Sequence, residues 1–176
     1  MRYTQLIDII KELKPKHVLE IGTHKAVRPR EWYKAHEFEQ YYGFDLFDDG
    51  TQELNVKEMN GKGFCTRKGA RQALGNIPHT LFQGLTCDTL PTFKDLNPSI
   101  KIDFAFIDGG HSIHTIRDDW QHVKSVMRPG GVVVFDDYYL PQRHGFGCNR
   151  VVEDIEHKVL PQSDVGVYLV RVNIPA

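Results

Sequence analysis

Two apolar segments that each end in acidic residues constrain this chain more than any other feature of its sequence. Residues 104–108 read Phe-Ala-Phe-Ile-Asp, and residues 132–137 read Val-Val-Val-Phe-Asp-Asp. Apolar runs of this length are typical of strands that are buried on both faces of a parallel sheet. If the two strands are neighbours, Asp108, Asp136 and Asp137 meet at the carboxyl edge of the sheet, where open α/β folds bind their ligands.

Strand and helix patterns alternate along the whole chain, which predicts an α/β fold with a mostly parallel sheet covered on both faces. We expect strands at residues 17–22, 41–45, 79–84, 103–108, 132–136 and 165–173, and helices at residues 3–13, 29–36, 70–74, 88–96, 113–127 and 150–159. Residues 48–67 are polar and contain glycines, so we expect a long surface loop that serves as a lid. The 176 residues are expected to form one domain, residues 1–176.

The overall composition excludes several classes of partner. A formal net charge of -1 gives no reason to expect nucleic acid or an anionic membrane surface. The apolar runs are of strand length, so we expect no transmembrane helix, and no signal peptide is visible. The three cysteines, Cys65, Cys87 and Cys148, have no metal-type spacing, so we interpret them as reduced thiols of a cytoplasmic protein.

Three carboxylates that meet at one sheet edge repel one another unless a cation joins them. Asp108, Asp136 and Asp137 offer only oxygen ligands, which suit magnesium, manganese or calcium better than zinc. His111 follows Asp108 by three residues, and an imidazole there can accept a proton near neutral pH. It can equally be a hydrogen-bonding neighbour of the metal, and the two acids after Phe135 can be plain strand-end residues.

A second pattern lies nearer the start of the chain. Gly22 ends an expected strand, and Asp45 ends the next one, where an acidic side chain can accept hydrogen bonds from ribose hydroxyls. The G-x-G-x-x-G fingerprint is absent, which argues against a pyrophosphate and leaves a nucleoside ligand open. In the simpler interpretation, Gly22 is only a tight turn and Asp45 only a strand-end cap.

Four motifs together resemble a known family. They are Val-Leu-Glu-Ile-Gly-Thr-His at residues 18–24, Tyr-Gly-Phe-Asp-Leu-Phe at 42–47, Ile-Asp-Gly-Gly-His-Ser at 107–112 and Val-Phe-Asp-Asp-Tyr at 134–138. The chain resembles the class I S-adenosylmethionine-dependent methyltransferases over nearly its whole length. Within them it is most similar to the metal-dependent branch of macrocin-type sugar O-methyltransferases and, more distantly, to catechol O-methyltransferase. That family has a Rossmann-like, seven-stranded sheet in the order 3-2-1-4-5-7-6 with the last strand antiparallel.

The resemblance also implies roles for individual residues. Glu20, Gly22 and Thr23 would surround the methionine part of the cofactor, Asp45 would bind its ribose, and Leu85, Thr86 and Cys87 would contact its adenine. Asp108 would contact both cofactor and metal, Asp136 and Asp137 would complete the metal site, and His111 would be the base. The chain departs from the family at Ala26, where a glycine is usual.

We therefore expect transfer of a methyl group from S-adenosylmethionine, with Mg²⁺, Mn²⁺ or Ca²⁺, to a hydroxyl of a small molecule such as a sugar, a glycosylated metabolite or a catechol. Relatives often pair, which leaves a homo-oligomer open. Two alternatives remain: a non-catalytic module that binds S-adenosylmethionine, and a metal-dependent hydrolase that uses the acids and His111. Arg28, Arg30, Arg143 and Arg150 either meet an anionic acceptor or, as we expect for most of them, lie in solvent.

Overall fold

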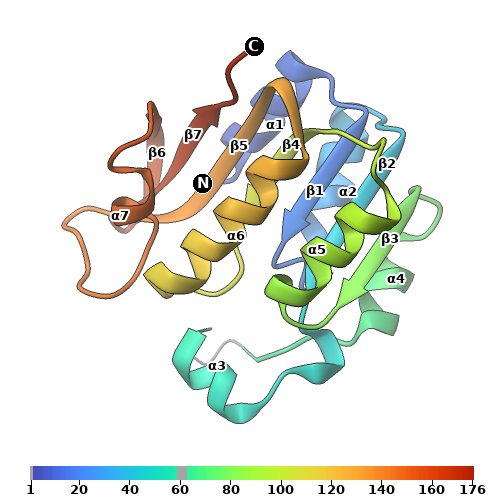
Figure 1. The fold of residues 1–176 in the computed structure, drawn as a ribbon, viewed down its shortest axis with the longest axis horizontal. Coiled ribbons are helices and arrows are strands. Elements are labelled where there is room, and N and C mark those ends of the chain that lie inside the picture. Colours follow the sequence, from blue (N-terminus) through green and yellow to red (C-terminus); the bar gives the residue numbers. More distant parts are fainter. Residues whose placement is uncertain (1, 59–62) are drawn as a thin grey trace.

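A seven-stranded sheet in the order β3-β2-β1-β4-β5-β7-β6 runs through the middle of the molecule (Figure 1). The computed structural model describes residues 2–58 and 63–176. The strands are β1 (His17–Ile21), β2 (Gln40–Asp45), β3 (His79–Gln83), β4 (Ile102–Ile107), β5 (Met127–Tyr139), β6 (Lys158–Asp164) and β7 (Val167–Asn173). Strands β1 to β5 pair in parallel, and β7 is antiparallel to both of its neighbours. The predicted class I methyltransferase topology is confirmed.

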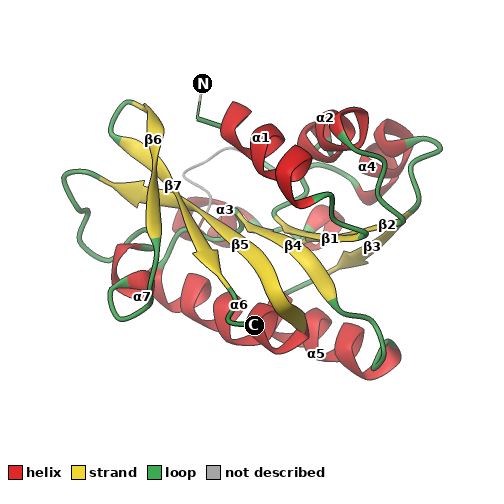
Figure 2. Cartoon of the chain, turned by 90° about the horizontal axis from the view of Figure 1, so that it is seen from above, coloured by secondary structure: helices red, strands yellow, loops and turns green. Residues whose placement is uncertain are grey.

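Helices cover both faces of the sheet in two layers (Figure 2). The helices are α1 (Thr4–Leu13), α2 (Val27–Ala35), α3 (Gln52–Glu58), α4 (Arg67–Leu74), α5 (Thr86–Leu96), α6 (Ile113–Val126) and α7 (Asn149–Val152), with a 3₁₀ turn at Phe47–Asp49. One layer contains α1, α2 and α4, and the other contains α5, α6 and α7 (Figure 2). Each layer packs an apolar core against its own face of the sheet.

The central strands are buried because both of their faces meet helices. Every residue of β4 is buried, and so are residues 132–136 of β5. Large aromatic side chains fill the two cores, among them Trp32 on one side and Phe93 on the other. Strands β4 and β5 are the two apolar segments that end in acidic residues. Their burial therefore fixes the position of these acids at the carboxyl edge of the sheet.

Two predicted elements differ from the structure. The helix expected at residues 150–159 is wrong: α7 ends at Val152, and the edge strand β6 begins at Lys158. Val151, Val152, Ile155 and Val159 have helical spacing, but the pairing of β6 with β7 decides the conformation of the segment. The expected loop at residues 48–67 is also more ordered than predicted, because it contains α3, and part of it (59–62) lies outside the described residues.

Helix α3 lies off the carboxyl edge of the sheet, below the ends of β1 and β2 in Figure 1. Its last residue, Glu58, joins it to the loop before α6. The Glu58 carbonyl accepts a hydrogen bond from His111 N (3.1 Å), and its carboxylate accepts one from Ser112 N (3.1 Å). Within the described part of the chain, no helix is long and apolar enough to cross a membrane.

Candidate active site

The carboxyl ends of β1, β2, β3 and β4 open onto two adjoining cavities. The large cavity, of about 200 Å³, is lined by Ile21, Gly22, Phe44, Asp45, Leu46, Leu54, Lys57, Glu58, Gly84, Leu85, Thr86, Gly109, Gly110, Thr115 and Asp119. The small cavity, of about 100 Å³, is lined by Tyr3, Gly22, His24, Arg28, Asp45, Gly63, Asp108, Gly109 and His111. Gly22, Asp45 and Gly109 belong to both walls. The cavities therefore lie where a parallel sheet of this topology binds its ligands.

Asp45 stands between the two cavities at the end of β2. Its Oδ2 accepts a hydrogen bond from the backbone N–H of His24 (2.7 Å), and its Oδ1 accepts one from Phe47 N (3.0 Å). These bonds fix the carboxylate between the loops that follow β1 and β2. Each oxygen keeps a further lone pair for a ligand hydroxyl. Asp45 therefore lies in the walls of both cavities, and its contact with a ribose stays a prediction.

Packing requires a glycine at position 22. It has a φ of +85°, and a β-carbon there would lie 1.9 Å from the carbonyl oxygen of Asp108. The ends of β1 and β4 therefore approach each other more closely than any side chain permits. Ala26, where the family usually has glycine, adopts the same left-handed region with a φ of 51°.

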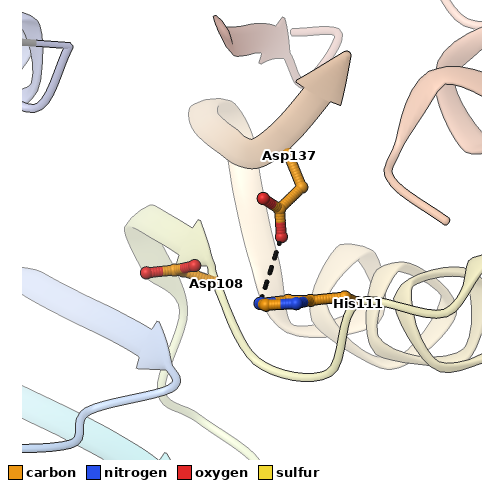
Figure 3. Close-up of side chains that lie close together, drawn as sticks. All are labelled: Asp108, His111 and Asp137. Carbon is orange, nitrogen blue, oxygen red and sulfur yellow. Dashed lines mark ion pairs between the residues drawn. The ribbon is translucent and has the colours of Figure 1, made fainter. Parts of the chain in front are cut away.

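Asp108, His111 and Asp137 form a compact cluster of potential metal ligands. Each contributes one ligand atom, and these atoms lie within 4.8 Å of one another. Asp108 follows β4, His111 lies on the loop before α6, and Asp137 lies on β5 (Figure 3). His111 Nε2 is 3.3 Å from Asp137 Oδ2. The Tyr139 hydroxyl donates to the other Asp137 oxygen at 2.9 Å, and the carboxylate raises the pKa of Tyr139 in addition to the effect of burial.

Asp136 lies apart from this cluster, although it is the neighbour of Asp137. Successive residues of a strand point to opposite faces, and β5 has a bulge between Phe135 and Tyr138, where Asp137 has a φ of 61°. Asp136 therefore faces α1, where its Oδ2 accepts hydrogen bonds from Arg2 (2.9 Å) and the Tyr3 hydroxyl (2.6 Å). Burial would raise the pKa of Asp136, but the charge and hydrogen bond of Arg2, together with the bonds from the Tyr3 hydroxyl and the Asp137 N–H, outweigh it and lower the pKa.

Arg28 brings a buried positive charge to the small cavity. Its Nε is 2.6 Å from Glu20 Oε1, its Nη1 is 2.6 Å from Asp108 Oδ2, and its Nη2 donates to the carbonyl of Gly22 at 2.9 Å. Burial alone would lower the pKa of Arg28, but the carboxylates of Asp108 and Glu20 raise it. Arg28 is therefore an exception to the solvent exposure expected for most of the four arginines, because three acceptors at the ends of β1 and β4 hold its guanidinium.

The other predicted cofactor residues divide into three groups. Leu85 and Thr86 line the large cavity, as an adenine contact requires. Glu20 and Thr23 lie beneath the surface, joined through the Tyr41 hydroxyl, which donates to Glu20 Oε2 at 2.5 Å and is 2.9 Å from Thr23 Oγ1. Burial raises the pKa of Glu20. Cys87 is exposed and is absent from both cavity walls, so its contact with the cofactor stays a prediction.

Sequence reasoning missed Arg2, Tyr3, Glu58 and Asp119 as residues of this region. Arg2 and Tyr3 reach the site only because α1 packs beside β4 and β5, a contact between residues more than 130 positions apart. Asp119 had a signal in the sequence: it lies among Ile116, Trp120 and Val123, on the face of α6 that is buried. An acid in an apolar stripe is a candidate functional residue.

Comparison with known proteins agrees with the fold. A family model described as a methyltransferase domain matches residues 19–138, which include the ends of β1, β2, β4 and β5. The chain belongs to this methyltransferase family. A curated relative, the uncharacterized protein y4gI of Sinorhizobium fredii, is 24% identical over 152 residues, or 79% of this chain. This methyltransferase chain spans about 15% of that relative's length.

Solved structures of methyltransferases share the fold of this family member. The O-methyltransferase TomG of Streptomyces achromogenes, in complex with SAM, aligns with a TM-score of 0.73 at 15% identity, covering 98% of this chain and 79% of that chain. An O-methyltransferase of Bacillus cereus in complex with SAH gives 0.71 at 15% identity, covering 97% and 80%. The N-methyltransferase NodS of Bradyrhizobium japonicum gives 0.63 at 12% identity, covering 99% and 95%. The shared fold thus includes both oxygen and nitrogen acceptors.

Proposed function

We propose that this methyltransferase transfers the methyl group of S-adenosylmethionine to a hydroxyl of a small molecule, with help from a divalent metal ion. The observation that carries the proposal is the cluster of Asp108, His111 and Asp137 beside the small cavity. A carboxylate pair with an imidazole suits the activation of a hydroxyl, which is a poor nucleophile until its proton is removed.

The adjoining cavities support a nucleoside donor of this kind. Phe44, Leu46 and Leu85 give the large cavity apolar walls, which suit a flat base. Asp45 stands at the boundary and can accept from ribose hydroxyls. The small cavity would then receive the methionine part, with its sulfonium directed toward His111.

The residues of the cluster fit a divalent cation. On the ends of β1, β4 and β5, four carboxylates (Glu20, Asp108, Asp136 and Asp137) face two guanidinium groups (Arg2 and Arg28), which leaves a surplus of two negative charges when all four acids are ionised. Asp108 and Asp137 would hold the ion, with magnesium or manganese as the expected metals. When bound, such an ion lowers the pKa of a coordinated hydroxyl.

The chain's own groups then handle the proton. His111 Nε2 accepts it from the acceptor hydroxyl, and Asp137 Oδ2, 3.3 Å away, stabilises the resulting imidazolium. Tyr139 holds the Asp137 carboxylate in place through its hydroxyl. An acceptor with two neighbouring oxygens, such as a sugar or a catechol, suits a site in which one oxygen is held and the other reacts. The free cysteines agree with a cytoplasmic enzyme.

The test combines calorimetry with a transfer assay. Titration with S-adenosylmethionine, with and without Mg²⁺ or Mn²⁺, measures donor binding, and labelled donor is then offered to matched dihydroxy, monohydroxy and amino acceptors. We expect donor binding at micromolar strength and metal-dependent transfer to the dihydroxy acceptor. Equal transfer in the presence of a chelator would overturn the metal role, and transfer to the amine alone would overturn the choice of oxygen.

One observation favours a second candidate, a module that binds the nucleoside without transferring a methyl group. Arg28 already satisfies Asp108 and the Gly22 carbonyl, the acceptors that the ammonium group of a bound methionine would need. In that case adenosine and S-adenosylmethionine would bind with comparable affinity, because the methionine part would add no binding free energy. Donor binding at least tenfold tighter than adenosine binding argues for the enzyme.

A further inference from the structure

The large cavity has a buried acid in its wall that no ion pair explains. Asp119 of α6 is 1% exposed, and its Oδ1 accepts a hydrogen bond from the Thr86 hydroxyl at 2.5 Å. Its Oδ2 is buried and has no hydrogen-bond partner among the described residues. Buried polar oxygens are nearly always paired, so an uncommitted carboxylate oxygen in a cavity wall calls for a ligand.

The surroundings of Asp119 define what that ligand must offer. The uncommitted oxygen lies on the Gly109 side, 3.6 Å from the position that a β-carbon of Gly109 would take. The Thr86 hydroxyl donates its hydrogen to Asp119 Oδ1, so the hydrogen-bond donor for Asp119 Oδ2 must come from the ligand. Burial raises the pKa of Asp119 to about 7, and the nearby acids Asp118 and Glu58 raise it further, against the lowering effect of the Thr86 bond. A neutral N–H donor fits this apolar wall better than a buried cation does.

We propose that Asp119 Oδ2 accepts a hydrogen bond from the exocyclic amine of adenine and thereby selects the base of the donor. The inference rests on the proposed nucleoside donor and adds the group that reads its base. Asp45 meets the ribose at the boundary of the cavity, and Asp119 meets the base in its interior. Hypoxanthine has an oxygen in place of that amine, and two acceptors facing each other repel. The cavity therefore prefers adenosyl over inosyl ligands.

The competing role for Asp119 is structural, since its bond to Thr86 ties α6 to the start of α5. The two roles differ in one measurable ratio. Loss of a structural tie weakens every ligand of the cavity by a similar factor, whereas loss of a base-reading group changes the preference between two ligands that differ only at the base. The ratio of dissociation constants is also insensitive to a partial loss of folded protein.

The experiment measures binding of S-adenosylhomocysteine and S-inosylhomocysteine by calorimetry to the full chain and to Asp119→Asn. We expect the chain to prefer the adenosyl ligand by roughly ten- to a hundredfold, as one unpaired buried acceptor costs, and the variant to prefer it by less than about threefold. Asparagine keeps the shape but offers a donor as well as an acceptor, so it tolerates either base. Asp118→Asn is the matched control, an identical change on the neighbouring residue, and must keep the original ratio.

The outcomes separate this inference from the function on which it rests. If neither ligand binds the unaltered chain, the nucleoside donor and the role of Asp119 are both overturned. If both bind and Asp119→Asn keeps the preference of the unaltered chain, only the role of Asp119 is overturned. Should Asp119→Asn not fold, Asp119→Ser gives the same reading, because it too removes the carboxylate.

Discussion

The two cavities at the carboxyl edge of the sheet treat buried charge in opposite ways. In the small cavity, guanidinium groups accompany the acids, since Arg28 contacts Glu20 and Asp108, and Arg2 contacts Asp136. In the large cavity, the hydrogen-bond partner of Asp119 is the Thr86 hydroxyl, and no ion pair of Asp119 is found among the described residues, although Lys57 lines the same cavity. The acids beside the small cavity are thus partly neutralised by guanidinium groups, whereas the large cavity has a buried carboxylate oxygen without a hydrogen-bond partner among the described residues. The difference agrees with the proposed roles, in which the small cavity holds the reacting groups and the large cavity recognises the base.

The largest effect is expected at the cluster of the small cavity. Asp137→Ala should reduce turnover by roughly a thousandfold or more, because His111 loses its partner and the metal loses a ligand. Binding of S-adenosylhomocysteine should change by less than about threefold. Transfer of a labelled methyl group measures the turnover, and calorimetry on the same preparation measures the binding of S-adenosylhomocysteine. A variant that keeps full turnover, even with chelator present, would remove Asp137 from the mechanism.

The charge pairing of the small cavity predicts the next largest effect. Arg28→Ala leaves two buried carboxylates without their cation, so the free energy of unfolding should fall by about 3 to 5 kcal/mol. Denaturant unfolding measures it. Arg30→Ala, an exposed residue of the same helix, is the control and should change stability by less than about 0.5 kcal/mol. Equal, small losses in both variants would contradict the pairing.

The uncompensated acid of the large cavity predicts an effect of the opposite sign. The pKa of Asp119 is about 7 in the folded state, above its ordinary value, so the folded chain holds a proton that the unfolded chain has lost. This contribution to stability is full below about pH 4 and disappears as the pH rises through 7. Asp119→Asn removes the buried charge, and at pH 8 it should be more stable than the unaltered chain by on the order of 3 kcal/mol. At pH 4 the two proteins should have the same stability. Thermal unfolding of both proteins at pH 4 and pH 8 tests this prediction.

The smallest effect separates the two neighbouring acids of β5. Asp136→Asn weakens the bonds to Arg2 and Tyr3, which should cost about 1 to 3 kcal/mol of stability. The binding of Mn²⁺ should change little if Asp137 and Asp108 hold the ion without Asp136. A loss of Mn²⁺ affinity above about tenfold would instead support the original prediction of Asp136 as a ligand.

Local sequence patterns located the ends of the strands but not the partners of their side chains. Asp108 and His111 share one short loop, so their proximity follows from the local sequence, and β4 and β5 were visible as apolar runs. Arg28 could not be placed in this way, because one of its acceptors, Asp108, lies 80 positions further along the chain. Its neighbours, Val27 and Arg30, are exposed, so the local pattern pointed to solvent.

The prediction failed for β6 for a related reason. Pro161 and the polar residues around it give the segment little strand character, and proline is tolerated there because β6 is an edge strand. The order of the strands came from family resemblance, since periodicity alone does not say which strands are neighbours. The pairing of Asp136 with the first residues of the chain depends on the same long-range contacts.

The bulge at Asp137 has a consequence for how the length of this chain can change. Sheet ends beside loops usually accept insertions and deletions, because only exposed backbone is displaced. Here one inserted or deleted residue between Phe135 and Tyr138 would rotate the following side chains to the other face and exchange the surroundings of the two acids. The Asp137 carboxylate, which now contacts His111, would then face α1. This point of the chain should therefore tolerate changes of residue far better than changes of length.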